Sequence, residues 1–166
     1  MTNNVNTESP LRCYVAAPWD CKPEAKAART KLEEAGFIVI SHWIDLLDDV
    51  AVTEKYEQEQ AEVDVEDLFN ADALVLLNLH KSEGKACETG MSIAAGMPVI
   101  CIGPRQNNIF LHLPEILQVD TIEEAINLLQ SYQTLQEEIF REAAQTQGFL
   151  DDAFIAEFSG GKIGNA

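Results

Sequence analysis

The chain has 166 residues, enough for one domain with a substantial core, and 46% of them are apolar, the usual share for a globular protein. Its 28 acidic and 11 basic residues give a net charge of −17, which excludes polymeric nucleic acid and anionic membranes as partners. No apolar run reaches the ~18 residues of a membrane span, and the start of the chain lacks the basic and apolar regions of a signal peptide. We therefore expect a soluble, cytoplasmic protein.

Apolar runs alternate with helix-forming segments along the chain. We predict strands, in chain order, over residues 11–17, 37–41, 71–79, 98–102 and 117–119. We predict helices over residues 23–35, 53–70, 84–96 and 122–132. Continuous apolar strands that alternate with helices are typical of a parallel sheet covered on both faces. Right-handed crossovers then predict a three-layer, doubly wound α/β fold, Rossmann-like or flavodoxin-like, with about five strands.

The local signals at helix ends agree with this pattern. Gly36 and Gly96 follow predicted helices as C-terminal glycines, and Thr53 and Thr121 are suited to cap helix N-termini. The expected organisation has four parts: a disordered tail over 1–10, a domain over 11–132, a helical extension over 133–158 and a frayed tail over 159–166. The extension begins as an amphipathic helix, which either covers the sheet or contacts a partner subunit.

The segment S-E-G-K-A-C-E-T-G, residues 82–90, leads into the third helix from the carboxyl end of a strand, where such sheets bind ligands. Gly84 lets the backbone approach a ligand, and the free N–H groups of the helix start can hold a phosphate. Glu88 can face the same cleft, and the positive helix end favours its ionised form, as a nucleophile requires. Alternatively, Glu88 is only a first-turn residue that complements the helix dipole.

Other polar and aromatic residues reach the same edge of the predicted sheet. Asp64 lies near the end of the second helix, among several acidic residues from which spacing alone does not choose. Trp19 and Trp43 follow the first two strands and can stack on a base, or at least one of them packs in the core. The phenol of Tyr14 can bond a carboxylate across the sheet end, or Tyr14 is an ordinary half-buried tyrosine.

The four cysteines indicate no metal site, because no pair shows the close spacing of metal ligands. Cys13 and Cys101 lie in apolar strands and are expected to be small buried hydrophobes. Cys87 is either a thiol with a lowered pKa at a helix start or a bystander beside Glu88. We expect no metal and no redox cofactor.

With these motifs in place, the chain resembles the nucleoside 2-deoxyribosyltransferase-like proteins, which include the 2′-deoxynucleoside 5′-phosphate N-hydrolases. The resemblance covers roughly residues 12–129. It depends on three pieces in order: Y-V-A-A-P near the start, D-V-E-D-L-F-N-A-D before the third strand, and S-E-G-K-A-C-E-T-G leading into A-A-G-M-P-V-I.

The resemblance implies roles for individual residues. Glu88 matches the family's nucleophile, Asp64 its catalytic aspartate and Tyr14 the tyrosine that positions the nucleophile. Ser82 and Gly84 match positions that hold the 5′-phosphate in the nucleotide hydrolases. The free-nucleoside transferases tend to have an aspartate in place of Ser82, so the resemblance favours a nucleoside 5′-monophosphate as the substrate.

The chain also departs from the family. Ala17 replaces a frequent glycine, and Lys85 and Cys87 are atypical in the nucleophile segment, although Lys85 can add a phosphate contact. The family borrows a polar residue from a neighbouring subunit, which implies a homo-oligomer. Asn108 and His112 are both candidates for that residue, and neither is favoured.

The family's chemistry is a retaining double displacement at the anomeric carbon, in which a glutamate forms a covalent glycosyl-enzyme. The expected function is therefore cleavage of an N-glycosidic bond, or base exchange, on a nucleoside or nucleotide. Two other functions fit the same scaffold: a module that binds or senses nucleotides without turnover, and a nicotinamide nucleotide glycohydrolase.

Overall fold

The computed structural model describes residues 10–47, 51–105 and 108–159. The predicted tails over 1–10 and 159–166 lie almost wholly outside the described residues. The chain divides into two compact units, Met1–Leu129 and Gln130–Ala166. None of the described helices combines the length and the apolarity needed to cross a bilayer.

The first unit has a five-stranded parallel sheet with the strand order β2-β1-β3-β4-β5. The strands are β1 (Arg12–Ala16), β2 (Ile38–Val39), β3 (Ala73–Leu77), β4 (Val99–Ile102) and β5 (Ile116–Val119). The α-helices are α1 (Lys22–Glu34), α2 (Glu54–Phe69), α3 (Glu83–Ala94) and α4 (Ile122–Ser159). Short 3₁₀ helices are η1 (Trp19–Cys21), η2 (His42–Asp45) and η3 (Ile109–His112). The predicted three-layer α/β fold is confirmed.

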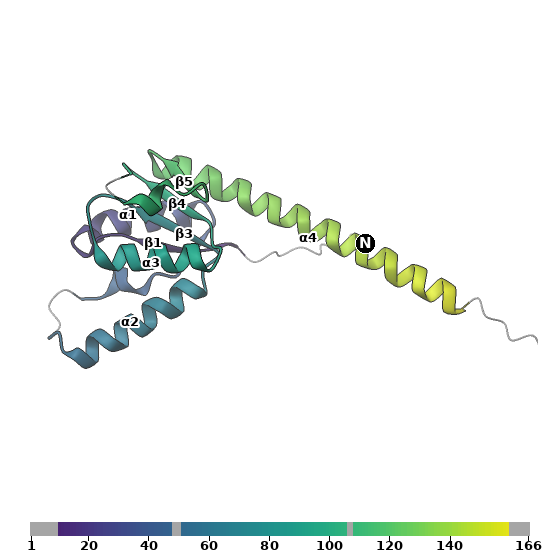
Figure 1. Ribbon diagram of the computed structural model, residues 1–166, viewed down its shortest axis with the longest axis horizontal. Coiled ribbons are helices and arrows are strands. Elements are labelled where there is room, and N and C mark those ends of the chain that lie inside the picture. The colour runs from purple at the N-terminus through teal and green to yellow at the C-terminus, as the bar shows by residue number, and fades with distance from the viewer. Residues whose placement is uncertain (1–9, 48–50, 106–107, 160–166) are drawn as a thin grey trace, which may run out of the picture. The chain divides into compact units, whose positions relative to one another are not determined.

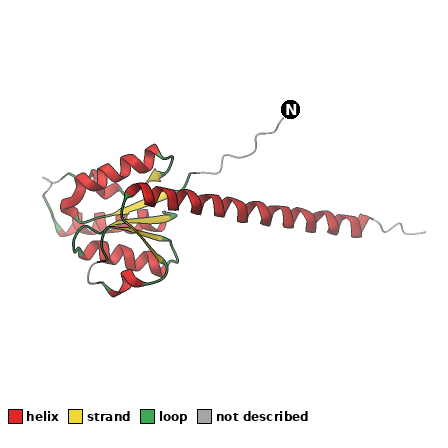
Figure 2. Ribbon diagram, turned by 90° about the horizontal axis from the view of Figure 1, so that it is seen from above, coloured by secondary structure: helices red, strands yellow, loops and turns green. Residues whose placement is uncertain are grey.

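The central strands explain the apolar runs in the sequence. β3 is buried along its whole length, and β1 from Cys13 onwards, because helices cover both faces of the sheet. Helices α2 and α3 lie together on one face (Figures 1 and 2). On the other face, Lys31 of α1 forms an ion pair with Glu123 in the first turn of α4. The carboxyl ends of β1, β3 and β4 therefore meet at one edge, where α3 begins.

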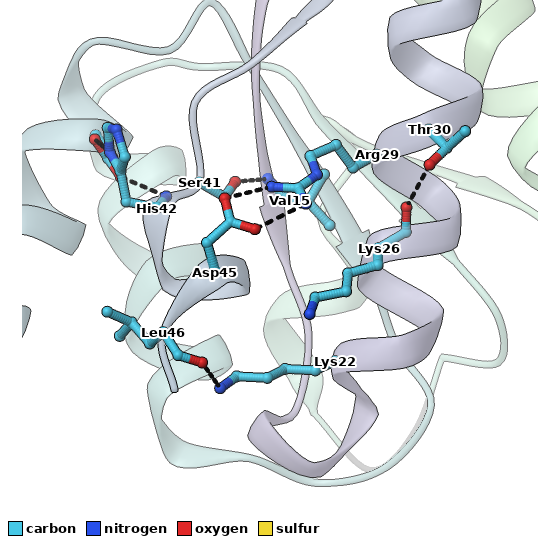
Figure 3. Close-up of polar contacts among 10 residues, drawn as sticks. Val15, Lys22, Lys26, Arg29, Thr30, Ser41, His42, Asp45 and Leu46 are labelled. Atoms are coloured by element: carbon cyan, nitrogen blue, oxygen red, sulfur yellow. Dashed lines mark hydrogen bonds and ion pairs between the residues drawn. The ribbon is translucent and has the colours of Figure 1, made fainter. Parts of the chain in front are cut away.

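Two predicted boundaries are wrong for identifiable reasons. β2 is shorter than predicted because the hydroxyl of Ser41 accepts the backbone N–H of Val15 at 2.6 Å, which replaces a strand carbonyl (Figure 3). The last helix does not end at Tyr132 but continues as α4 to Ser159. No proline interrupts it, and Gly148 alone does not end it.

The Ser41 hydrogen bond yields a stability prediction. Ser41→Ala leaves the buried N–H of Val15 without its acceptor, so we expect the free energy of unfolding to fall by about 1–3 kcal/mol. Thr30→Ala is the control, because the exposed Thr30 hydroxyl only donates to the carbonyl of Lys26 within α1, and we expect a change below about 0.5 kcal/mol. Urea unfolding measures both. Equal stability of the two variants would contradict the structural role of Ser41.

Candidate active site

The hydroxyl of Tyr14 donates a 2.7 Å hydrogen bond to Oε1 of Glu88. Tyr14 is fully buried in β1, and Glu88 is half-buried on α3. The two residues are 74 positions apart in the sequence, so the sheet topology alone brings them together. Two of the three residues for which the sequence predicts catalytic roles are therefore in direct contact.

Glu88 lies deeper in α3 than the sequence indicated. The hydroxyl of Ser82 accepts the N–H of Lys85 at 3.4 Å and caps the helix, which begins at Glu83. Glu88 consequently lies in the second turn, whereas the field of a helix terminus acts mainly within the first turn. Glu83 is the acidic residue of that first turn. The alternative in which Glu88 is a first-turn residue for the helix dipole is therefore wrong.

Asp64, on α2, is the third member of the group. The pKa of Asp64 is raised from 3.8 to about 6, chiefly by burial and then by the charge of Asp67. The nearby Tyr14 hydroxyl lowers that pKa, and so does His42. The Tyr14 hydroxyl therefore interacts with both Asp64 and Glu88, although spacing alone did not select Asp64 among the acidic residues of α2.

The charges of this group are set mainly by burial. Burial raises the pKa of Glu88 from 4.5 to about 7; the Tyr14 hydrogen bond opposes this increase, and Asp64 adds to it. Burial, followed by the charges of Glu88 and Asp64, strongly raises the pKa of Tyr14, which keeps its hydroxyl protonated as a donor. Near neutral pH the two carboxylates therefore compete for a proton, which is the arrangement that acid–base chemistry needs.

A histidine–aspartate pair beside this group was not identified from the sequence. Asp67 is buried and accepts both the backbone N–H and the ring Nδ1 of His42, at 2.9 and 2.7 Å. His42 begins η2, the segment after β2. Figure 3 shows two contacts that hold this segment: the Arg29 guanidinium donates to the Asp45 carboxylate, and the Lys22 ammonium donates to the carbonyl of Leu46. The only sequence signal was a histidine directly after a predicted strand.

A cavity of about 680 Å³ lies along α3 at the carboxyl edge of the sheet. Ser82, Lys85 and Asn108 line it, together with Leu76, Asn78, Lys81, Glu83, Ala86, Thr89, Ile109 and Leu111. The structure thus brings together three of the predicted substrate-binding residues. Tyr14, Asp64 and Glu88 are not among its lining residues.

Lys85 is positioned differently from the phosphate contact that the sequence suggested. It is buried, and its ammonium donates to Oδ1 of Asn78 at 2.6 Å and to the carbonyl of His80 at 2.5 Å. Nδ2 of Asn78 in turn donates to the carbonyl of Pro104 at 2.5 Å. Lys85 therefore links α3 to the segments that follow β3 and β4.

The two tryptophans are unlike each other. Trp43 is a core residue, 5% exposed, and its indole N–H donates to the carbonyl of Val15 at 2.9 Å. Trp19 is 50% exposed, with the Lys22 ammonium 3.6 Å from its ring centroid and the Trp43 ring 6.3 Å away. Of the two, only Trp19 presents a large exposed surface. The alternative in which at least one tryptophan packs in the core holds for Trp43, and the expectation that Trp43 stacks on a base is wrong because its ring is buried.

The remaining predicted residues lie around the start of α3 and in η3. Gly84 is exposed, and a Cβ at this position would come no closer than 4.0 Å to the Ser82 hydroxyl, so the protein's own packing does not require glycine. Asn108 caps η3 through the N–H of Phe110. His112 is exposed at the end of η3 and does not line the cavity.

No protein-family model and no curated protein matches the chain. Among solved structures, the 2-deoxyribosyltransferase of Bacillus psychrosaccharolyticus matches 70% of this chain and 90% of its own, with 21% identity and a TM-score of 0.54. A conserved protein of Enterococcus faecalis V583 matches 75% of this chain and 99% of its own, with 15% identity and a TM-score of 0.55. The chain has the fold of a 2-deoxyribosyltransferase. The fold that the three sequence motifs implied is thereby confirmed.

A CMP N-glycosidase of Clostridium botulinum also matches, with 17% identity and a TM-score of 0.48, over 73% of this chain and 99% of its own. A deoxyribosyltransferase fold does not by itself determine the reaction.

Proposed function

We propose that this protein cleaves the N-glycosidic bond of a nucleoside or nucleoside 5′-monophosphate, or exchanges its base, through a covalent glycosyl-Glu88 intermediate. The observation that carries the proposal is the Tyr14–Glu88 hydrogen bond of 2.7 Å, with Asp64 interacting with the same hydroxyl. Three elements distant in sequence supply two carboxylates with raised pKa values and one fixed donor. Retaining glycosidases likewise use two carboxyl groups, one as the nucleophile and one as the acid–base group.

In the first step, an oxygen of ionised Glu88 attacks C1′ while the bond from C1′ to the base nitrogen breaks and its electron pair leaves with the base. Asp64 in its protonated form gives its proton to the departing base. The Tyr14 hydroxyl orients the attacking carboxylate, because its hydrogen bond to Oε1 restricts how the side chain can rotate. The products are free base and a glycosyl ester of Glu88.

In the second step, Asp64, now ionised, takes a proton from water or from a second base, which attacks C1′ and releases Glu88. Both carboxylates return to their starting protonation states. The pKa of about 6 supports the role of Asp64, because a group that both gives and takes a proton works best near the operating pH. Glu88, with a pKa of about 7, attacks in its ionised form and takes no part in the proton transfer.

The start of α3 supports the substrate class. Gly84 is exposed and not required by the protein's own packing, which favours close approach of a ligand to the backbone there. Ser82 and the helix N-terminus offer a hydroxyl and N–H groups to an anionic phosphate, despite the chain's net charge of −17. The exposed ring of Trp19 is suited to stack on a base.

A homo-oligomer is part of the same proposal. Asn108 or His112, on either side of Ile109 and Phe110, which are 79% and 59% exposed, would complete the site of a neighbouring subunit. A second cavity of about 440 Å³ lies between Phe110 and the α3 residues Gly90 and Ile93. Sedimentation velocity tests the homo-oligomer. A species of two or more subunits would support it, and a monomer at micromolar concentration would contradict it.

Incubation with a panel of nucleosides, nucleoside 5′-monophosphates and nicotinamide mononucleotide tests the activity, with free base measured by chromatography. We expect release from at least one deoxynucleotide, and exchange when a second base is added if transfer competes with hydrolysis. Binding without release from any member would contradict catalysis and favour a sensing module. If nicotinamide mononucleotide were the one member of the panel to lose its base, the proposal of a deoxynucleotide substrate would be contradicted.

A further inference from the structure

Three side chains with metal-ligand chemistry converge at the carboxyl edge of the sheet, apart from the Tyr14–Glu88 pair. Asp20 and Cys21 belong to η1, and His80 follows β3. Nε2 of His80 is 2.9 Å from Oδ1 of Asp20 and 3.5 Å from Sγ of Cys21, and that sulfur is 4.0 Å from Oδ1 of Asp20. An oxygen, a nitrogen and a sulfur ligand thus face one another.

These separations resemble the ligand shell of tetrahedral zinc. Zinc bonds of about 2.0 Å to oxygen, 2.0–2.1 Å to nitrogen and 2.3 Å to sulfur, at tetrahedral angles, place the ligand atoms about 3.3–3.6 Å apart. The three observed distances differ from that range by less than about 0.5 Å. Side-chain rotations of Asp20, which is 74% exposed, are enough to remove the difference.

The orientation of His80 adds an independent observation. Its Nδ1 lies 3.1 Å from the carbonyl oxygen of Lys81, which only accepts hydrogen bonds, so Nδ1 carries the proton. Nε2 faces the Asp20 carboxylate at 2.9 Å, and two such atoms require a proton or a metal ion between them. A proton satisfies that pair, but the Cys21 sulfur makes a third ligand that a metal ion would use. Histidine ligands of zinc commonly donate their other N–H to such a carbonyl.

We propose that Asp20, Cys21 and His80 bind one zinc ion, which connects η1 to the segment after β3 and leaves a fourth position for water or another ligand. Sulfur and imidazole ligands favour zinc over magnesium or calcium, and the net charge of −17 attracts cations. On binding, zinc displaces the Cys21 thiol proton to solvent, and the thiolate sulfur bonds to the metal. The Lys85 ammonium holds the carbonyl of His80, so this ligand is attached to a fixed backbone.

Zinc titration of the reduced full-length protein, followed by calorimetry and by metal analysis after gel filtration, tests the site. We expect one zinc per chain. Because the loss of a second-shell partner alone costs about 10–100-fold in affinity, we expect Cys21→Ser and His80→Ala each to lose at least ~100-fold. Cys87→Ser and His112→Ala are matched controls with exposed thiol and imidazole, and we expect them to bind as the wild type does.

Cobalt substitution provides a readout that requires the sulfur. A thiolate-to-cobalt charge-transfer band, present in the wild type and Cys87→Ser but absent in Cys21→Ser, is the expected result. Circular dichroism checks that each variant is folded, and Asp20→Asn replaces any variant that is not. Failure of the wild type to retain zinc, or retention of zinc by both Cys21→Ser and His80→Ala, would overturn the proposal.

Discussion

Replacing Glu88 with glutamine is expected to lower the rate of base release by at least about 10³-fold, because the amide cannot form the glycosyl ester. Glutamine keeps the shape of the side chain and an oxygen that accepts the Tyr14 hydroxyl, so the site should remain assembled. Glu34→Gln is the control, since Glu34 is exposed at the end of α1 and lies outside the proposed site, and we expect near wild-type rates. Full activity of Glu88→Gln would exclude Glu88 as the nucleophile.

The same substitution should stabilise the protein at alkaline pH. Burial raises the pKa of Glu88 from 4.5 to about 7, so the folded chain binds this proton more tightly than the unfolded chain does. The free energy of unfolding therefore falls as pH rises from about 4.5 to about 7, and the full penalty is present above that window. At pH 8, Glu88→Gln should be more stable than the wild type by about 1–3 kcal/mol.

Urea unfolding of the wild type, Glu88→Gln and Glu34→Gln at pH 4.5 and pH 8 measures this effect. The gain for Glu88→Gln should shrink towards zero at pH 4.5, where the carboxyl group is protonated in the folded chain and about half protonated in the unfolded chain. Glu34→Gln should show no comparable dependence. A gain that is equal at both pH values would mean that the charge of Glu88 is not the cause.

Replacing Tyr14 with phenylalanine is expected to lower kcat by about 10–10²-fold, since it removes one charge-assisted hydrogen bond worth about 1.5–3 kcal/mol. The bond lowers the pKa of Glu88, so its loss should raise that pKa above about 7. The acidic limb of the pH–rate profile should then move to higher pH. Tyr56→Phe on α2 is the control, with no expected shift. An unchanged limb in Tyr14→Phe would contradict the positioning role.

Much of the fold follows from local patterns. The strands of the central sheet could be predicted because residues buried on both faces, as in β3, must be apolar throughout. The caps Thr53 and Thr121 were identified correctly, because a hydroxyl before a helix accepts a free N–H. The extent of β2 could not be predicted, since the Ser41 hydroxyl acts on Val15, 26 residues away.

The candidate site was predictable to a different degree for each residue. The resemblance selected Tyr14, Asp64 and Glu88, and spacing alone could not have done so. Lys85 shows the limit of sequence reasoning, because a lysine near a helix start suggested an anion contact, whereas its ammonium is bonded to Asn78 and His80.

Sequence reasoning also missed the clusters whose members come from distant segments, because spacing along the chain does not show which segments meet in the fold. Cys21 and His80 are 59 positions apart, and only the parallel arrangement of β1 and β3 brings them together. A search for closely spaced cysteines therefore indicated no metal site. His42 and Asp67 were missed likewise, since each residue by itself looks like an ordinary surface polar residue.

Trapping the intermediate tests the covalent chemistry most directly. The protein is mixed with a 2′-fluoro nucleotide, whose electronegative substituent disfavours the oxocarbenium-like transition state and slows turnover, and is then digested and analysed by mass spectrometry. We predict that the peptide containing Glu88 gains the mass of the glycosyl group and that Glu88→Gln gains none. Base release with no adduct on Glu88, or an adduct on another residue, would contradict the assignment of Glu88 as the nucleophile.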